Sequence, residues 1–598
     1  MAFDWPAIPL KTATKFGARV TEPAEIIEEA LSIEVPSSAQ LMLDDTRRLT
    51  GPGMLWHRPG AVLDILYTGF DTGKIVEVWR VEAHRVLVAI GWGDEHLIER
   101  PFDGGISLAL SAPLDQLYSA TFAAQTIWHF CAGELLGAAT GDFSTMIEEL
   151  KSVMSREANP MLIALVEAAK ERDVEALVDD DFLSVGHGVT SLVWPVLGLP
   201  SPDEVNWKSV SNIPVALITG TNGKTTSTRL VNAIAQAAGR VAGLTSTDMV
   251  SVGTDILDRG DYSGPGGARM LLRDKRVEMG FLEVARGGIL RRGLPVLSAR
   301  AALVTNVAAD HLGQFGVNTV EELAVVKMAV HQSLADDGVL ILNADDPLVV
   351  QQAVKTPATI WWFSVHEASD QIISARSNGI SCGWLEGTAL KFFDGTNTIP
   401  VIDVNEVPIT MSGAAQYNVL NTLGAICLSH AMGLDLAAIR AGLSGFQNDP
   451  KDNPGRCNEF DVNGARVFVD FAHNPHSIQA VIEAMRVIPA KRRFVMLSHA
   501  GDRSNQDILD VTASALAMNP DFVVATELPE HIRGREVGEV SALIGQECKA
   551  RGLKSEQILM ASSPADGAKQ ILERLHSGDL ALLLVLSERD QVFEMLGN

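Results

Sequence analysis

The sequence is poor in cysteine, in basic residues and in long apolar runs, and each shortage excludes a class of protein. The five cysteines among 598 residues are widely spaced, odd in number and without paired Cys/His spacing, which argues against a zinc site and a disulfide framework. Lysine and arginine number 48 against 74 aspartates and glutamates, and the resulting net charge of −26 disfavours nucleic acids and anionic membranes as partners.

No stretch of the chain approaches the roughly 18 apolar residues that cross a bilayer. The first residues, Met-Ala-Phe-Asp-Trp-Pro, lack the basic region and apolar core of a secretory signal. We therefore expect a cytoplasmic protein with reduced, buried thiols. Its oligomeric state stays open, and a homo-oligomer is compatible with the sequence.

The length and the 46% content of hydrophobic residues indicate large folded cores. Three domains are expected at about 150 residues or more each. A segment rich in turn formers at 198–204 ends the first domain. The predicted domains are an N-terminal α+β domain at 1–204, a central domain at 205–447 and a C-terminal domain at 448–598.

The N-terminal domain mixes strand and helix patterns. Strands are predicted at 61–66 and 85–92, and helices at 117–136 and 160–177. Arg47 and Arg48 could face an acidic substrate, although paired arginines are more often simply solvated. His187, between two glycines, is read as a turn or packing residue.

In the other two domains apolar strands alternate with helices, which predicts α/β folds with mostly parallel sheets and ligands at the strand carboxyl ends. The central pattern gives strands at 214–219, 278–283, 301–307 and 338–342, and helices at 224–238 and 319–334. The C-terminal strands are expected at 467–471, 494–497, 522–525 and 580–586. The C-terminal domain is Rossmann-like in its alternation but has no dinucleotide glycine fingerprint, so NAD binding is not inferred.

One stretch in the central domain has the pattern of a phosphate-binding loop. The apolar run starting at Val215 ends in Thr219-Gly-Thr-Asn-Gly-Lys-Thr-Thr226, directly before a helical pattern. Backbone N–H groups and Lys224 would face polyphosphate oxygens, and the Thr225 hydroxyl would bind Mg²⁺. Ile218 stands where the commonest P-loop rule has its first glycine, so the generic motif alone is insufficient. The predicted phosphate-binding residues are Gly220, Thr221, Asn222, Gly223, Lys224, Thr225 and Thr226.

This loop resembles the nucleotide loop of the Mur ligase family, the ATP-dependent enzymes that join an amino acid to a carboxylate. Further short motifs are similar to the Mur-ligase-like half of the cyanophycin synthetases, in the same order, over about residues 205 to 598. They lie at 262–265, 282–293, 306–313, 343–346, 453–456 and 469–475. The resemblance implies a three-domain Mur-ligase-like architecture with a central P-loop ATPase domain.

Cyanophycin synthetases also carry an ATP-grasp domain before this half. The 200 or so residues that precede the phosphate loop are too few for an N-terminal domain and an ATP-grasp domain together. We therefore expect a related ligase with a single active site, without the activity that extends an aspartate backbone.

The resemblance assigns residues to the metal site. Glu283 matches the family glutamate that binds Mg²⁺, and His311 the histidine at a second metal; with Thr225 they form the predicted metal set. Lys327 stands where many relatives carry a carbamylated lysine. The alternatives are a solvated strand-end charge for Glu283, a helix cap for Asp310 and His311, and an exposed lysine on an amphipathic helix for Lys327.

For the nucleotide, the resemblance implies that Asn343 reads adenine, Arg456 reaches the phosphates and Asp470 holds the ribose. These residues belong to different predicted domains. ATP would therefore be held between the central and C-terminal domains, and closure would keep water from a reactive intermediate.

Three groups of residues are candidates for substrate binding. His473 and Asn474 follow a C-terminal strand, although Asn474 could equally cap the next helix. Asp502 and Arg503 could bind an ammonium and a carboxylate. The arginines of the 282–293 motif could dock an acidic acceptor or form a structural salt-bridge cluster; they are Arg286, Arg291 and Arg292.

These patterns favour a ligase that uses ATP and Mg²⁺ to phosphorylate a carboxylate and couples it to the amine of an amino acid, releasing ADP and phosphate. Lys224, Glu283, His311 and Lys327 are the predicted catalytic residues. By analogy alone, the acceptor is an aspartate-containing peptide and the donor a basic amino acid. The alternatives are a non-catalytic ATP-binding scaffold for another synthetase and a simple acyl kinase.

Overall fold

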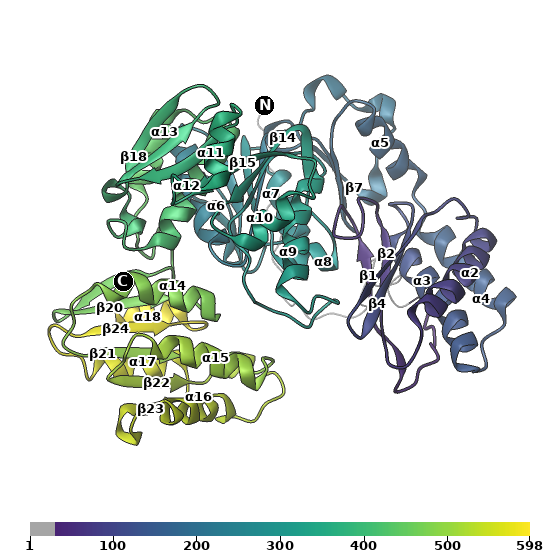
Figure 1. Cartoon of the computed structure of the whole chain (residues 1–598). Coiled ribbons are helices and arrows are strands. Elements are labelled where there is room, and N and C mark those ends of the chain that lie inside the picture. Colours follow the sequence, from purple (N-terminus) through teal and green to yellow (C-terminus); the bar gives the residue numbers. More distant parts are fainter. Residues whose placement is uncertain (1–29, 598) are drawn as a thin grey trace, which may run out of the picture.

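A computed structural model describes residues 30–597 of the chain, and Figure 1 shows its sheets in three lobes. The first lobe, on the right of the figure, holds an antiparallel sheet of order β1-β2-β4-β3 covered by helices. Its strands are β1 (Leu41–Leu49), β2 (Gly60–Tyr67), β3 (Leu97–Phe102) and β4 (Gly105–Ser111), and its helices α2 (Thr72–Ile90), α3 (Leu117–Leu136) and α4 (Phe143–Glu157). The predicted strand at 61–66 and helix at 117–136 are confirmed.

The strand predicted at 85–92 is wrong, because these residues form the last turns of α2 and the turn after it. The apolar run there is only half of a longer helical repeat. Asp71 starts that repeat by accepting from the Lys74 N–H, and Gly91 ends it with a φ of 88°. The buried positions recur every three or four residues at Ile75, Val78, Trp79, Ala83, Val86, Leu87 and Ile90.

A small antiparallel sheet links this lobe to the next. The helix predicted at 160–177 is shorter, since α5 (Pro160–Lys170) is followed by the strand β5 (Ala176–Val178). β5 pairs with β6 (Phe182–Val185), which pairs with β7 (Leu192–Pro195). His187 follows β6 and is fully buried, which agrees with its reading as a packing residue.

The second lobe is built on an eleven-stranded sheet of order β11-β10-β9-β12-β8-β13-β14-β15-β16-β17-β18. Neighbours from β9 to β16 are parallel and the pairs at both edges are antiparallel, so the prediction of a mostly parallel sheet is confirmed. The strands that place functional residues are β8 (Val215–Thr219), β9 (Ala242–Thr245), β12 (Met279–Glu283), β13 (Ala299–Val304) and β14 (Leu334–Asn343). The remaining strands are β10 (Met249–Val252), β11 (Asp255–Arg259), β15 (Thr359–Ser364), β16 (Cys382–Glu386), β17 (Ala389–Phe393) and β18 (Thr398–Asp403).

Helices cover both faces of this sheet, since alternate residues of its central strands face opposite sides. Ala216 and Ile218 pack with α6 (Lys224–Ala237), α12 (Gln416–Ala431) and α13 (Leu436–Gly445). On the other face, Val215 and Leu217 pack with α7, α8, α9 and α10. These helices span Pro265–Leu272, Arg286–Arg291, Val320–Met328 and Pro347–Ala353, and α11 spans Asp370–Ser377.

The third lobe, at the lower left of Figure 1, holds a six-stranded sheet of order β19-β20-β24-β21-β22-β23. All pairs are parallel except β19 with β20. The four strands predicted here are confirmed as β20 (Ala465–Asp470), β21 (Arg493–Leu497), β22 (Phe522–Thr526) and β24 (Leu580–Leu584). The other elements are β19 (Asn458–Val462), β23 (Ile558–Ala561), α14 (Pro475–Arg486), α15 (Asn505–Leu516), α16 (Glu539–Ala550), α17 (Pro564–Leu572) and α18 (Arg589–Met595).

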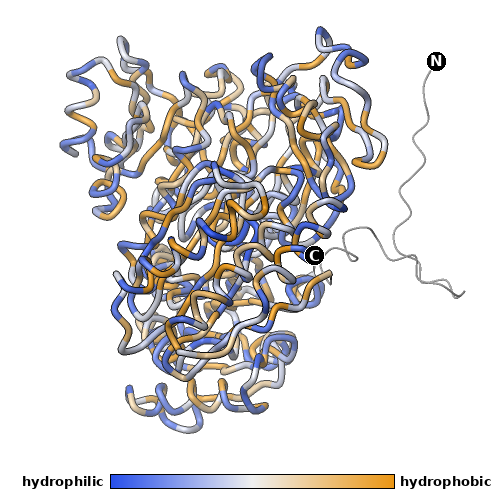
Figure 2. Tube along the Cα trace, turned by 90° about the vertical axis from the view of Figure 1, so that its right-hand side faces the viewer, coloured by the Kyte–Doolittle hydropathy of each residue, from blue (hydrophilic) through white to orange (hydrophobic). Residues whose placement is uncertain are grey.

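Hydrophobic stretches run through the interior of the lobes, while many outer turns are hydrophilic (Figure 2). All five cysteines are buried free thiols within the described part of the chain, as expected. Among residues 30–597 there is no helix that is both long enough and apolar enough to cross a membrane.

Candidate active site

A cleft of about 680 Å³ opens where the carboxyl ends of β8, β12, β13 and β14 face the start of α14 in the third lobe. Eleven of the residues predicted to bind or activate ligands line it together. They are Thr221, Asn222, Gly223, Lys224, Thr225, Thr226, Glu283, Asn343, Arg456, Asp470 and His473. The sequence motifs therefore meet at one cavity, which lies between the second and the third lobe.

The phosphate loop has the backbone shape that a bound anion requires. Gly223 caps α6 with a φ of 84°, and a Cβ atom there would lie 2.2 Å from Oδ1 of Asn421. α6 begins at Lys224, so its unpaired N–H groups and positive dipole end point at the cleft. The Nζ of Lys224 donates to the Thr221 carbonyl oxygen at 2.9 Å, which keeps the cation over the loop.

The carboxylate of Glu283 lies directly beside this loop. Its Oε2 accepts from the Thr225 hydroxyl at 2.9 Å, and Thr247 donates its N–H to the same atom at 3.4 Å. The side chain is only 1% exposed, so the reading of Glu283 as a solvated strand end is wrong. Burial raises its pKa, an effect that the charge of Lys224 opposes.

The other carboxylate oxygen of Glu283, Oε1, is buried and has no hydrogen-bond partner among the described residues. An unpaired carboxylate oxygen and a neighbouring threonine hydroxyl are suitable ligands for Mg²⁺, which binds one or two carboxylates and completes its shell with water and phosphate oxygens. Within residues 30–597 no cluster of three or more His, Cys, Asp or Glu side chains could hold a metal by itself. Water and phosphate oxygens would therefore supply the remaining ligands of a metal here.

Lys327 of α9 is buried beneath the phosphate loop, so the reading of an exposed lysine on an amphipathic helix is wrong. Its Nζ donates to the Gly220 carbonyl oxygen at 2.8 Å. Burial, and next the charge of Lys224, lowers its pKa well below the usual value. A lowered pKa favours the neutral amine, the form that carbamylation requires, and carbamylation itself stays a prediction.

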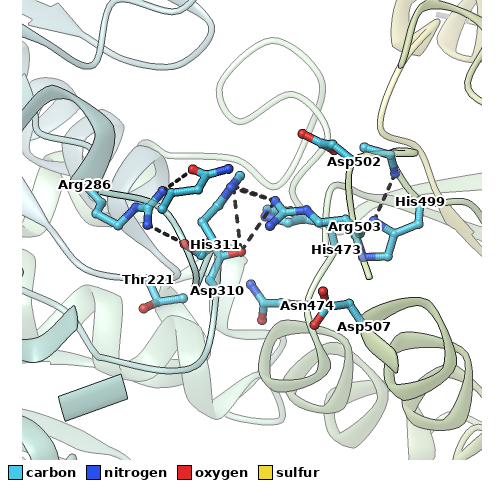
Figure 3. Close-up of polar contacts among 12 residues, drawn as sticks. Thr221, Arg286, Asp310, His311, His473, Asn474, His499, Asp502, Arg503 and Asp507 are labelled. Carbon is cyan, nitrogen blue, oxygen red and sulfur yellow. Dashed lines mark hydrogen bonds and ion pairs between the residues drawn. The ribbon is translucent and has the colours of Figure 1, made fainter. Parts of the chain in front are cut away.

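Asp310 and His311 do not cap a helix, because α9 begins only at Val320 and the pair lies in a loop after β13. His311 has a φ of 52°, and the Nη2 of Arg503 from the third lobe lies 2.8 Å from both of its ring nitrogens. Figure 3 shows these two side chains pointing toward each other, with Arg286 on the opposite side of His311. Burial lowers the pKa of His311 to about 4, so the ring is neutral at pH 7.

Asp310 lies among basic side chains. Burial raises the pKa of its carboxyl group, but the interactions with His473, His311 and Arg503 outweigh that effect and hold the pKa below its usual value. In the structure His311 therefore lies next to Arg503 and Asp310, and Thr225 lies next to Glu283. That Thr225, Glu283 and His311 form one set of metal ligands stays a prediction.

At the other end of the cleft, the amide of Asn343 links two turns. Its Nδ2 donates to the Thr305 carbonyl oxygen and its Oδ1 accepts from the Asp345 N–H, each at 2.9 Å. One N–H and one lone pair of the amide remain for a ligand. The neighbouring lining includes Phe363 and Leu348, which supply apolar surface for a flat ring.

Arg456 and Asp470 enter the cleft from the segment that joins the two lobes and from the end of β20. The guanidinium of Arg456 lies 4.9 Å from the centre of the Phe471 ring, and this contact orients it. The Oδ1 of Asp470 accepts from the Ala472 N–H at 2.6 Å. Burial raises the pKa of Asp470 to about 6, despite the opposing charge of Arg456.

Asn474 caps α14, as one of its two predicted roles requires, and it also contacts the phosphate loop; it is not among the residues that line the cleft, and its role in substrate binding stays a prediction. Its Oδ1 accepts from the Ser477 N–H at 2.9 Å, and its Nδ2 donates to Oδ1 of Asn222 at 3.1 Å. His473, immediately before it, lies with Nδ1 2.9 Å from the Phe471 carbonyl oxygen.

The remaining predicted substrate residues lie outside the cleft lining. Arg286 contacts the His311 carbonyl oxygen and donates to Oε1 of Gln314 at 2.7 Å. Asp502 pairs with Arg533 at 2.6 Å. Arg291 and Arg292 are exposed at the surface, next to the first lobe, where the Arg292 carbonyl oxygen accepts from the Thr50 N–H.

The Arg47 and Arg48 side chains have partners within the protein, so they are not simply solvated. Arg47 is buried against Asp64, and Arg48 lies over the Tyr118 ring and pairs with Asp180 at 3.2 Å.

Sequence reasoning missed a charged cluster where the second and third lobes meet. Asp248 accepts from Arg229 of α6 at 3.2 Å and from Arg589 of α18 at 3.1 Å. Arg229 also donates to the Asp452 carbonyl oxygen and Arg589 to that of Pro454, in the connecting segment before Arg456. Asp248 and Arg589 are 341 positions apart, so no local pattern could have joined them.

Comparison with known proteins agrees with this geometry. The family model of the Mur ligase middle domain matches residues 218–429, which contain the phosphate loop and Glu283. The model of the Mur ligase glutamate ligase domain matches residues 455–584, which contain Arg456 and Asp470. The chain belongs to the Mur ligase family.

Individual relatives of this Mur ligase chain cover the same region. The cyanophycin synthetase of Geminocystis herdmanii is 37% identical over 363 residues, which are 60% of this chain and 40% of that protein. The UDP-N-acetylmuramoyl-L-alanyl-D-glutamate--2,6-diaminopimelate ligase of Chlorobaculum tepidum is 26% identical over 61% of this chain and 70% of its own. The chain thus spans less than half the length of the cyanophycin synthetases that it matches.

Among solved structures, the Mycobacterium tuberculosis folylpolyglutamate synthase complexed with ADP aligns with 64% of this chain and 91% of its own, at 17% identity and a TM-score of 0.49.

Proposed function

We propose that the protein is an ATP- and Mg²⁺-dependent ligase that phosphorylates a carboxylic acid and joins it to the amine of an amino acid, releasing ADP and phosphate. The observation that carries the proposal is the Thr225–Glu283 pair. A buried carboxylate with one unpaired oxygen stands beside the phosphate loop and Lys224, in a cleft that two lobes enclose. Such an arrangement suits a metal-bound polyphosphate better than a neutral ligand.

Each part of ATP has candidate partners among the lining residues. The start of α6 and Lys224 would hold the β- and γ-phosphates, with Arg456 as a second cation. Asp470 would accept from the ribose hydroxyls, and Asn343 would hydrogen-bond adenine. Mg²⁺ would neutralise the charge that develops on the transferred phosphoryl group, the main requirement of such a reaction.

Amide formation from an acid needs an activated leaving group. Transfer of the γ-phosphoryl group to a carboxylate oxygen gives an acyl-phosphate and ADP. An amine then attacks the carbonyl carbon and expels phosphate. Because Arg503 and His473 come from the third lobe, its approach to the central sheet would surround this intermediate and exclude water.

The substrate class follows from the relatives and stays a proposal. They include a protein named cyanophycin synthetase and one named as a diaminopimelate ligase. We propose an amino acid as donor and an acid or acidic peptide as acceptor, with a basic amino acid and an aspartate-containing peptide as the first pair to test. The use of ATP agrees with the predicted cytoplasmic location.

ADP release with panels of acids and amines tests the proposal. A ligase releases ADP in bulk only when both substrates are present, and mass spectrometry then finds the amide product. An acyl kinase needs only the acid, and a non-catalytic scaffold releases no ADP with any pair. Either of these last two outcomes would refute the ligase assignment.

A further inference from the structure

The loop at 310–317, called here the His311 loop, has an unfavourable backbone conformation at two bulky residues. His311 has a φ of 52° and Phe315 a φ of 56°. Side chains with a Cβ atom rarely occupy this left-handed region, and such residues persist only where their surroundings hold them. The contacts that hold this loop therefore decide where Asp310 and His311 stand.

Arg286 holds the first of these two positions. It contacts the His311 carbonyl oxygen and the Gln314 side chain (Figure 3). This contact comes from α8, within the same lobe as the loop.

Phe315, the second of these residues, is held by side chains of the first lobe. Arg100, in β3, donates through Nη2 to the carbonyl oxygens of Phe315 at 3.0 Å and of Gly316 at 2.9 Å. The guanidinium of Arg47 lies 4.9 Å from the centre of the Phe315 ring. Arg100 is half-buried, and burial lowers its pKa.

The fit between Arg100 and the loop is close. Gly316 has a φ of 63°, and a Cβ atom there would lie 2.4 Å from the Phe102 ring and 2.6 Å from Nη2 of Arg100. Just beyond the loop, Asn318 donates to the Asp103 carbonyl oxygen at 3.1 Å. The β3–β4 hairpin of the first lobe therefore packs closely on the His311 loop at Gly316.

We infer that Arg100 is a positioning residue for the proposed ligase reaction, and that holding the His311 loop is a function of the N-terminal sheet. Arg100 fixes the far end of the loop and Arg286 the near end. Together they keep Asp310 and the His311 ring opposite Arg503 of the third lobe. Without Arg100, Phe315 can leave the left-handed region, and His311 loses its fixed position relative to Arg503. This inference rests on the proposed function for its effect on rate, but not for its effect on the loop.

Steady-state kinetics of four variants test the effect on rate. Arg100→Met should lower kcat at least about tenfold, while the KM for ATP stays within about twofold, because the loop lies outside the cleft lining. Arg100→Lys, which keeps a cationic donor on a shorter side chain, should recover part of the loss. Gly316→Ala keeps Arg100 but displaces it, so it should lower kcat as well. The matched control is Arg80→Met. It removes an exposed arginine of α2 that pairs with Glu99, the residue before Arg100 in β3.

Hydrogen exchange gives a second readout that needs no catalysis. Within the loop the Gly313 N–H donates to the Val317 carbonyl oxygen, and the Val317 N–H to that of Gln314. These amides should exchange at least about tenfold faster in Arg100→Met than in the wild type, and at the wild-type rate in Arg80→Met.

The two readouts separate the possible failures. If the wild type releases ADP with both substrates but Arg100→Met keeps the wild-type kcat, the positioning role is wrong and the proposed function stands. If the wild type releases no ADP, the proposed function fails, and the exchange data still decide the role of Arg100. Unchanged exchange in Arg100→Met would overturn the inference whatever the kinetics.

Discussion

Asn222 of the phosphate loop and Asn474 of the third lobe meet amide to amide, with Nδ2 of Asn474 donating to Oδ1 of Asn222 at 3.1 Å. The same Asn474 caps α14 through its Oδ1. One side chain thus starts the helix that borders the cleft and links that helix to the loop that would hold the phosphates.

Two variants separate these roles. Asn474→Asp keeps the capping oxygen but removes the amide donor, so it should leave the midpoint of urea unfolding nearly unchanged and lower kcat/KM for ATP about tenfold. Asn474→Ala removes both groups and should also cost about 1 kcal/mol of unfolding free energy. Equal kinetic constants in the aspartate variant and the wild type would show that the link to Asn222 does not contribute to ATP use.

Lys224→Ala should abolish ADP release, by about 10³-fold or more, without unfolding the protein. The ammonium group lies over the phosphate loop, and no other side chain in the described chain occupies that position at the start of α6. ADP release is measured together with the thermal unfolding curve, and Lys208→Ala serves as the exposed-lysine control. Normal ADP release by Lys224→Ala would refute the assignment of this loop.

Glu283→Gln should raise the Mg²⁺ concentration needed for half-maximal activity about tenfold or more, because the amide oxygen is a much weaker ligand than the carboxylate. The fold should survive, since the side chain keeps an oxygen to accept from Thr225. Glu278→Gln is the matched control, because Glu278 lies just before β12, at the end away from Glu283, where its carboxylate accepts from the Val241 N–H. An unchanged Mg²⁺ titration in Glu283→Gln contradicts the metal assignment.

The raised pKa of Asp470 predicts a pH dependence with a definite sign. Its folded value of about 6 exceeds the ordinary 3.8, so the folded state holds the proton more tightly and the unfolding free energy falls as pH rises from about 4 to 6. A shift of about two pKa units corresponds to roughly 3 kcal/mol. The decline should be smaller in Asp470→Asn than in the wild type, and urea unfolding at a series of pH values measures it.

The same ionisation should act on nucleotide binding. Because the ionised carboxylate is the stronger acceptor for ribose hydroxyls, the KM for ATP of the wild type should fall as pH rises through about 6. A similar fall in Asp470→Asn would assign the pH dependence to another group.

Local residue patterns predicted the central elements well, because the phosphate loop, β8 and α6 are encoded by neighbouring residues. Buried parallel strands such as β21 and β24 are continuous apolar runs, and these are hard to mistake. The second half of α2 misled the prediction, since its β-branched run resembles a strand when it is read without the residues from 72 to 84.

Side-chain partners across lobes were not predictable in this way. The contacts of Asp248 with Arg589 and of Arg100 with Phe315 join residues hundreds of positions apart, on elements whose docking depends on the whole fold. The burial of ionisable side chains was not predictable either. Lys327 and Glu283 are residues that a sequence pattern places in solvent as easily as in a cavity, and only the packing around them shows that they are buried.

The central claim is that the acid is phosphorylated before the amine attacks, and transfer of oxygen from the acid to phosphate tests it most directly. Once an acid and an amine that support ADP release are known, the acid is labelled with ¹⁸O in its carboxylate and the released phosphate is analysed by mass spectrometry. The account predicts one ¹⁸O atom in each phosphate, because the oxygen that attacks the γ-phosphorus leaves with it when the amide forms. Unlabelled phosphate, released together with ADP and the amide product, would contradict an acyl-phosphate intermediate.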